Sequence, residues 1–145
     1  MLTKLKMVDS LYTYVECGAY TLFEHKLYRL TGSDLTVENI WNLYQQIGLQ
    51  FGFDSRQWDP REFITIPHFY TDPLYNISYV VSNDLALQFY QLEQAESGTG
   101  LQLFEECVTD ESSYLLDFAE RYDLKNPFAD GRLEEIADMF RDALF

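Results

Sequence analysis

Hydrophobic residues recur every three or four positions over most of the chain, which is the spacing of one face of an α-helix. The longest such stripe predicts a helix over residues 1–30, ended by Thr31-Gly32-Ser33, where Gly32 suits a left-handed C-terminal cap. A second stripe runs from Val37 to Leu49. It predicts a helix capped by Thr36, whose hydroxyl can accept a free N–H group of the first turn.

Residues 53–72 form the longest stretch without helical periodicity, and residues 63–66 within it are compatible with a short extended segment. Loops of this length are uncommon in compact domains and are often functional. A third helix is predicted over residues 73–96, with Pro73 in its first turn, where the missing N–H costs nothing. Its first half is apolar on nearly every side, so we expect it to be buried.

Shorter helices are predicted over residues 101–108, over residues 111–122 with Asp110 as the cap, and after Asp130-Gly131 near the end of the chain. The chain has no internal repeat, low-complexity tract or dividing linker. We therefore expect an all-α fold, a bundle of about five to six helices in which residues 1–145 form a single helical unit.

The net charge of −14 argues against nucleic acid as a partner, because phosphate binding needs clustered lysines and arginines. Cys17 and Cys107 are far apart and form no disulfide pattern, which favours a reducing compartment and a cytoplasmic location. No apolar run is long enough to span a bilayer, and the first residues do not resemble a signal peptide. A membrane partner is therefore not expected.

Common catalytic and metal-binding motifs are absent from the sequence. The only histidines, His25 and His68, do not form a His-Glu-x-x-His pair, in which two residues four apart grip one zinc ion from the same helix face. A Gly-x-Ser-x-Gly elbow and a glycine-rich phosphate loop are also absent. We therefore expect no metal ligands and no cofactor in this chain.

One segment nevertheless combines polar aromatic side chains with a histidine. A proline-bounded loop brings His68 to the start of the third predicted helix, where Tyr75 and Tyr79 are four residues apart and share one face. An imidazole and phenols can stabilise a developing oxyanion or bind a peptide backbone. Composition alone favours core tyrosines whose hydroxyls are satisfied internally, although it leaves both interpretations open.

Residues 66–82 (IPHFYTDPLYNISYVVS) resemble the C-terminal region of oligoendopeptidase F, a zinc metallopeptidase of the thimet oligopeptidase family. Shorter matches keep the same order along the chain: FEHKLY at 23–28, LTVE at 35–38, ALQFYQL at 86–92, GTG at 98–100 and NPF at 126–128. The resemblance thus covers essentially the whole chain. The loop-and-helix motif is its most specific part.

The resemblance implies that the His-and-Tyr segment lies across the active-site channel from zinc. It implies that His68 and Tyr79 stabilise the tetrahedral intermediate, and that His68, Tyr75, Tyr79 and the more variable Tyr70 bind substrate. Ile77 departs from the family pattern, in which another aromatic residue is common, so the preference for particular peptides stays open.

The family's zinc-binding His-Glu-x-x-His helix and its third ligand, a glutamate, precede the matched region, and this chain starts after them. Glu16 and Glu24 are not assigned as ligands merely because they are carboxylates on a helix. Because zinc supplies most of the catalysis in such enzymes, the isolated chain is expected to be inactive.

Two hypotheses follow. In the first, the chain is the C-terminal part of a peptidase for short peptides, as a fragment, a truncated reading frame or one half of a split enzyme whose N-terminal half brings the zinc. In the second, it is a non-catalytic helical interaction module that kept the fold and lost the zinc site. Self-association is compatible with both, because apolar helices without their family partners would expose surface.

Overall fold

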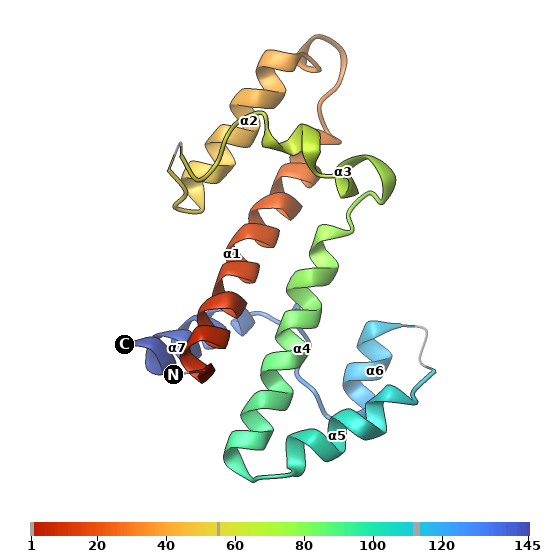
Figure 1. Cartoon of the computed structure of the whole chain (residues 1–145). Helices are drawn as coiled ribbons and strands as arrows, with labels where there is room; N and C mark the ends of the chain where they lie inside the picture. Colours follow the sequence, from red (N-terminus) through yellow and green to blue (C-terminus); the bar gives the residue numbers. More distant parts are fainter. Residues whose placement is uncertain (1, 55, 112–113) are drawn as a thin grey trace. The chain divides into compact units, whose positions relative to one another are not determined.

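The computed structural model describes residues 2–54, 56–111 and 114–145, and all regular structure in these residues is helical. The all-α fold class is confirmed, with seven α-helices where about five to six were expected. They are α1 (Leu2–Leu27), α2 (Val37–Gln50), α3 (His68–Thr71), α4 (Asn76–Ala95), α5 (Thr99–Val108), α6 (Leu115–Arg121) and α7 (Arg132–Leu144) (Figure 1). Two 3-10 helices, η1 (Gly32–Asp34) and η2 (Glu62–Thr65), lie between them.

Contacts divide the chain into two compact units. Unit 1 comprises Met1–Val8 with Val81–Phe145, and unit 2 comprises Asp9–Val80. The expectation that residues 1–145 form a single helical unit stays a prediction. No helix in the described ranges is both long and apolar enough to cross a membrane.

Aromatic residues build the core of unit 2, where α2 lies beside the second half of α1 (Figure 1). The buried cluster consists of Ala19, Tyr20, Phe23, Tyr44, Ile47, Phe53, Trp58, Phe63 and Phe69. The Trp58 ring stacks on Tyr44 at a centroid distance of 4.5 Å, and its indole N–H donates to the Tyr44 carbonyl oxygen at 2.9 Å. The segment without helical periodicity therefore packs onto α1 and α2 through its aromatic side chains, each of which buries a large area.

Gly48 of α2 leaves the space that Trp58 fills, because a methyl group at this position would overlap the indole ring. We expect Gly48→Ala to lower the free energy of unfolding by about 1–3 kcal/mol, the usual cost of overpacking a core. Gly18→Ala in α1 is the matched control, since its new Cβ would lie 3.3 Å from the edge of the Phe51 ring, which needs to yield only slightly. Urea titration of both variants measures the difference. Equal stabilities would show that Trp58 does not depend on this space.

A buried ion pair organises unit 1. The Arg132 guanidinium at the start of α7 donates to the Asp84 carboxylate of α4 at 2.6 Å, and both side chains are almost fully buried. One helical turn further along α4, Gln88 bonds to the backbone of Lys125 through both its amide nitrogen (3.1 Å) and its amide oxygen (2.7 Å). These contacts attach the segment before α7, and α7 itself, to α4.

Local sequence signals located two helix starts correctly. Thr36 caps α2 by accepting the Asn39 N–H at 3.2 Å. Gly131 immediately precedes α7 and has a positive φ. In each case the residue that marks the helix start lies within one turn of it, so the start can be recognised from the sequence alone.

Other local predictions were wrong. The first helix was expected over residues 1–30 with Gly32 as its cap, but α1 ends at Leu27, and Gly32, with its φ of +56°, begins the 3-10 helix η1 instead. Residues 63–66, interpreted as a possible extended segment, lie mostly in the 3-10 helix η2, whose Phe63 is buried in the core. Asp110 does not cap a helix over residues 111–122: α6 begins only at Leu115 after Tyr114, and residues 112–113 lie outside the described ranges. The Asp110 carboxylate instead accepts hydrogen bonds from Arg121 and Tyr122.

The third predicted helix also begins later than expected. Pro73 is not in its first turn, because α4 starts at Asn76 and residues 72–75 form a turn in which Leu74 has φ of +63°. The first half of α4 is not buried on every side either: Asn76 and Val81 are buried, whereas Tyr79 is 38% exposed. This break in the helix separates α3 from α4, and the tyrosines on either side of it, Tyr70, Tyr75 and Tyr79, are partly exposed.

Candidate functional site

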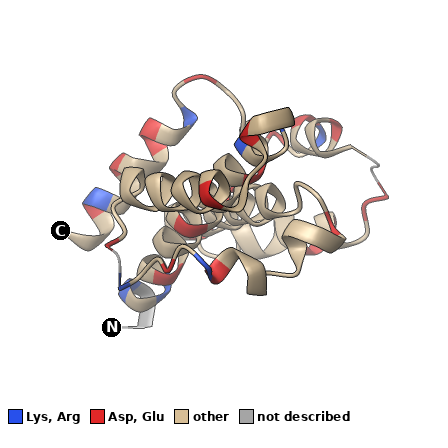
Figure 2. Ribbon diagram, turned by 90° about the horizontal axis from the view of Figure 1, so that it is seen from above, with Lys and Arg blue, Asp and Glu red and all other residues tan. Residues whose placement is uncertain are grey.

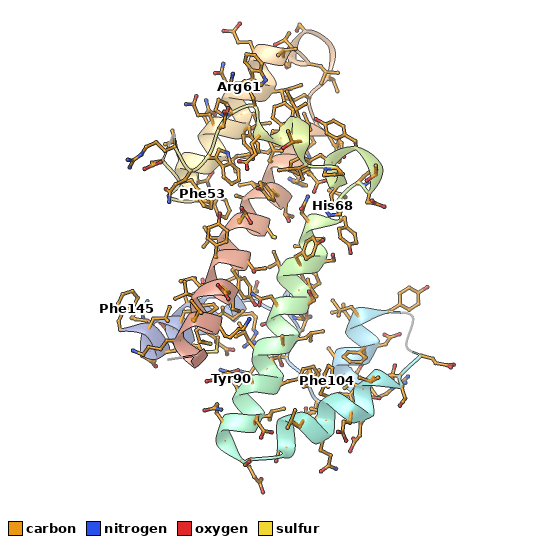
Figure 3. All side chains as sticks on the ribbon, in the orientation of Figure 1. Phe53, Arg61, His68, Tyr90, Phe104 and Phe145 are labelled. Atoms are coloured by element: carbon orange, nitrogen blue, oxygen red, sulfur yellow. The ribbon has the colours of Figure 1, made fainter. Side chains whose placement is uncertain are left out.

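The turn between α3 and α4 brings together three of the four site residues predicted from the sequence, all within unit 2. Figure 3 shows His68 on the short α3 segment, close to the start of α4. The His68 Nε2 atom lies 3.2 Å from the Tyr79 hydroxyl oxygen, and the His68 ring centroid lies 4.7 Å from that of Tyr75. The Tyr75 and Tyr79 rings meet edge to face at 5.3 Å. We refer to His68, Tyr75 and Tyr79 as the His-Tyr cluster.

Tyr70, the fourth predicted residue, is not part of this cluster. It lies on α3 with 59% of its surface exposed, and no ring contact or hydrogen bond joins it to His68, Tyr75 or Tyr79 within the described part of the chain. Partial burial raises the pKa of its phenol, so the group is protonated at neutral pH. The assignment of Tyr70 to substrate binding stays a prediction.

Glu24 of α1 fixes the turn that carries the cluster, a role that sequence reasoning did not identify. Its side chain is fully buried, and its carboxylate accepts the Leu74 backbone N–H at 2.9 Å and the Asn76 side-chain amide at 2.8 Å. Hydrogen bonds to an ionised group are stronger than neutral ones, and a buried carboxylate requires them. Glu24 thus joins α1 to the first residue of α4.

A second contact, made by the residue that directly follows α1, holds the other side of the cluster. The Tyr28 hydroxyl donates to the carbonyl oxygen of Phe69 at 3.0 Å, and the Phe69 side chain is buried among Tyr20 and Phe23. Because Phe69 follows His68 directly, these contacts fix the backbone of α3. The cluster is therefore attached to rigid parts of unit 2 on both sides while its polar atoms remain near the surface.

The electrostatic surroundings keep Tyr79 protonated. Desolvation, followed by the neighbouring Tyr75 phenol, raises the pKa of Tyr79 above its ordinary value. On the opposite side of the imidazole, His68 Nδ1 is buried without a hydrogen-bond partner and lies 3.9 Å from the Asp72 carboxylate. At neutral pH the cluster therefore presents a neutral phenol that can donate a hydrogen bond.

The two cysteines lack the properties of catalytic nucleophiles. Burial raises the pKa of Cys17 to about 11, and burial with the nearby Asp110 and Glu106 carboxylates raises the pKa of Cys107. Because the thiolate is the reactive species, a raised pKa makes a thiol inert at neutral pH.

Acidic residues are distributed through the helices rather than gathered in one segment (Figure 2). Within the described ranges, no three histidine, cysteine, aspartate or glutamate side chains come together in a way that could hold a metal ion. His25 is exposed on α1, next to the buried Glu24. The residues described here therefore do not fit a zinc site, although the resemblance of residues 66–82 implies that zinc belongs to the complete enzyme.

No protein-family model, curated protein or solved structure matches this chain. The resemblance to oligoendopeptidase F thus stays a hypothesis that rests on the motif at residues 66–82 and on the ordered shorter matches. The geometry of the His-Tyr cluster is an independent observation, and any function assigned to it has to be argued from its chemistry.

Proposed function

We propose that this chain is the C-terminal helical part of an oligoendopeptidase F-like zinc peptidase and supplies one wall of a channel for short peptides. The observation that carries the proposal is the His-Tyr cluster, in which His68 Nε2 lies 3.2 Å from the Tyr79 hydroxyl. All three side chains of the cluster are between about a third and a half exposed, so a ligand has access to them. The free cysteines accord with a reducing, cytoplasmic setting.

Each member of the cluster has a role in this proposal. The protonated Tyr79 hydroxyl donates a hydrogen bond to the carbonyl oxygen of the scissile peptide as negative charge develops there. The imidazole of His68 touches that hydroxyl and limits its orientation, and the exposed face of Tyr75 offers an aromatic surface to the substrate. The reaction adds one water molecule across a peptide bond.

The zinc ion of such an enzyme acts as a Lewis acid and lowers the pKa of its bound water. In our proposal an N-terminal half holds this ion, because the described residues of this chain bring no suitable ligands together. The isolated chain is accordingly inactive. The partners are the zinc-bearing half and a short peptide, with no role for nucleic acid or a membrane.

Complementation tests the proposal. The reading frame upstream of Met1 is searched for His-Glu-x-x-His, and the half that carries this motif is co-expressed with the present chain; if the frame lacks it, the zinc-bearing half of an oligoendopeptidase F is used. We expect the two halves to co-purify and to cleave a quenched fluorescent peptide in a chelator-sensitive way, whereas neither cleaves it alone. Co-purified, zinc-loaded halves that leave the peptide intact would contradict the proposal.

One observation favours the alternative of a non-catalytic interaction module. On α5, the outward residues Leu101, Phe104 and Val108 follow helical spacing and are each more than half exposed. A contiguous apolar face of this kind is typical of a protein–protein contact. The module hypothesis predicts self-association or partner binding without any peptide cleavage, so the complementation experiment separates the two functions.

A further inference from the structure

We infer that Asp72 is a positioning residue that keeps the proton of neutral His68 on Nδ1 and so directs the Tyr79 hydroxyl onto Nε2. Neutral imidazole carries a hydrogen on one ring nitrogen and a lone pair on the other, and the surroundings of each nitrogen determine which form prevails. The consequence for peptide hydrolysis rests on the proposed function. The tautomer itself is a property of this chain alone.

The two ring nitrogens of His68 have different surroundings. Nε2 lies at hydrogen-bond distance from the Tyr79 hydroxyl, which can either donate or accept. Nδ1 is buried without a hydrogen-bond partner, and the Asp72 carboxylate 3.9 Å away is the charged group recorded nearest to it in the described residues. The Tyr79 contact thus permits either tautomer, and the surroundings of Nδ1 decide between them.

The position of Asp72 is fixed by local hydrogen bonds. Its backbone N–H donates to the His68 carbonyl oxygen at 3.2 Å and closes the turn of α3. The single hydroxyl hydrogen of Thr71 can be donated to the Asp72 Oδ2 atom at 2.7 Å, or to the more distant Pro67 carbonyl oxygen at 3.1 Å. The same carboxylate oxygen faces Nδ1. The carboxylate is therefore held at this edge of the imidazole.

Electrostatics then favour one tautomer. With the hydrogen on Nε2, the lone pair of Nδ1 would point towards a negative carboxylate, which is repulsive. With the hydrogen on Nδ1, the positive end of the N–H dipole faces the carboxylate. Water screens the attraction only in part, because Nδ1 is buried although the Asp72 side chain is 60% exposed. Nε2 then carries the lone pair and accepts the hydrogen of the Tyr79 hydroxyl.

His68 and Tyr79, which the sequence analysis assigned to the same role, have different roles in this arrangement. The Tyr79 hydroxyl keeps its hydrogen and can redirect the hydrogen bond that it donates, from His68 Nε2 to a substrate oxygen. Neutral His68 has no hydrogen on the nitrogen that faces Tyr79, so it orients Tyr79 and does not itself donate from there. Asp72 acts one step further away, through His68.

Nitrogen-15 NMR of the full-length chain tests the inference. Nδ1 and Nε2 resonances of neutral histidine report which nitrogen carries the hydrogen, and spectra are recorded in alkaline buffer, where imidazoles are neutral. The chain has only two histidines, so a His25→Gln variant assigns the His68 signals. We expect His68 to be predominantly the Nδ1–H tautomer. A predominant Nε2–H form would overturn the inference.

Replacing the carboxylate provides the second arm. Asp72→Asn should lower the ratio of Nδ1–H to Nε2–H in His68 about fivefold, as expected for the loss of a nearby charge. Asp72→Ala repeats the measurement without an amide that can form new hydrogen bonds. Asp59→Asn, which removes a carboxylate paired with Arg61, is the matched control and should leave the ratio unchanged.

An unchanged ratio in folded Asp72→Asn and Asp72→Ala would also overturn the inference. The amide spectrum of each variant shows whether α3 and the turn before α4 are intact, so loss of structure is distinguished from loss of the charge. Failure of peptide cleavage in the complementation experiment would remove the proposed function but would leave the tautomer result standing.

Discussion

In the complemented peptidase, Tyr79→Phe is expected to reduce turnover of a short peptide about 100-fold, because removing one donor to a developing oxyanion typically costs that much. The change deletes only the hydroxyl that lies 3.2 Å from His68 Nε2 and keeps the ring that packs against Tyr75. The Michaelis constant should change much less than turnover, since the hydrogen bond strengthens as charge develops in the transition state. Steady-state kinetics with a quenched fluorescent peptide measures both.

Tyr114→Phe serves as the control for this substitution. Its ring is 73% exposed in unit 1, and it lies outside the His-Tyr cluster, so turnover should stay at the level of the unchanged chain. Thermal unfolding of Tyr79→Phe verifies that the fold is retained. If the folded Tyr79→Phe protein turned the peptide over at the normal rate, Tyr79 would have no part in stabilising the oxyanion.

The helical architecture was predictable because it depends on information carried within a few residues. The apolar stripes of α1 and α2, the Thr36 cap and the glycine before α7 all act over one or two turns. The start of α4 was not predictable in this way. Pro73 is well suited to a first helical turn, but Leu74 is held in a left-handed conformation by Glu24, which lies 50 residues earlier in the chain.

The candidate site was predictable to a similar degree. The spacing of Tyr75 and Tyr79 indicates a shared helix face, and their rings do meet. That His68 joins them and Tyr70 does not depends on the turn between α3 and α4, whose geometry is fixed by long-range contacts. A single signal for Glu24 existed in the sequence: it directly follows Phe23 on the apolar face of α1, and a carboxylate there requires partners.

The importance of Glu24 leads to the second large effect. Glu24→Ala is expected to lower the free energy of unfolding by about 2–4 kcal/mol, because it leaves the buried Asn76 amide, and also the partly buried Leu74 N–H, without their acceptor. Glu24→Gln should cost less, since its amide oxygen can still accept one of the two hydrogen bonds. Urea unfolding followed by tryptophan fluorescence measures both changes, because Trp58 lies in the core of the same unit.

His25→Ala, at the neighbouring exposed position of α1, is the matched control and should change stability by no more than about 0.5 kcal/mol. Glu24 should affect the His-Tyr cluster as well as stability, because its carboxylate holds the turn that carries Tyr75 and leads to Tyr79. In the Glu24→Gln variant the His68 and Tyr79 resonances should shift even under conditions in which the protein is fully folded, whereas those of His25→Ala should not. A Glu24→Ala variant as stable as His25→Ala would show that other contacts hold the turn. The geometry of the cluster would then depend on the contacts that Phe69 makes with Tyr20, Phe23 and Tyr28.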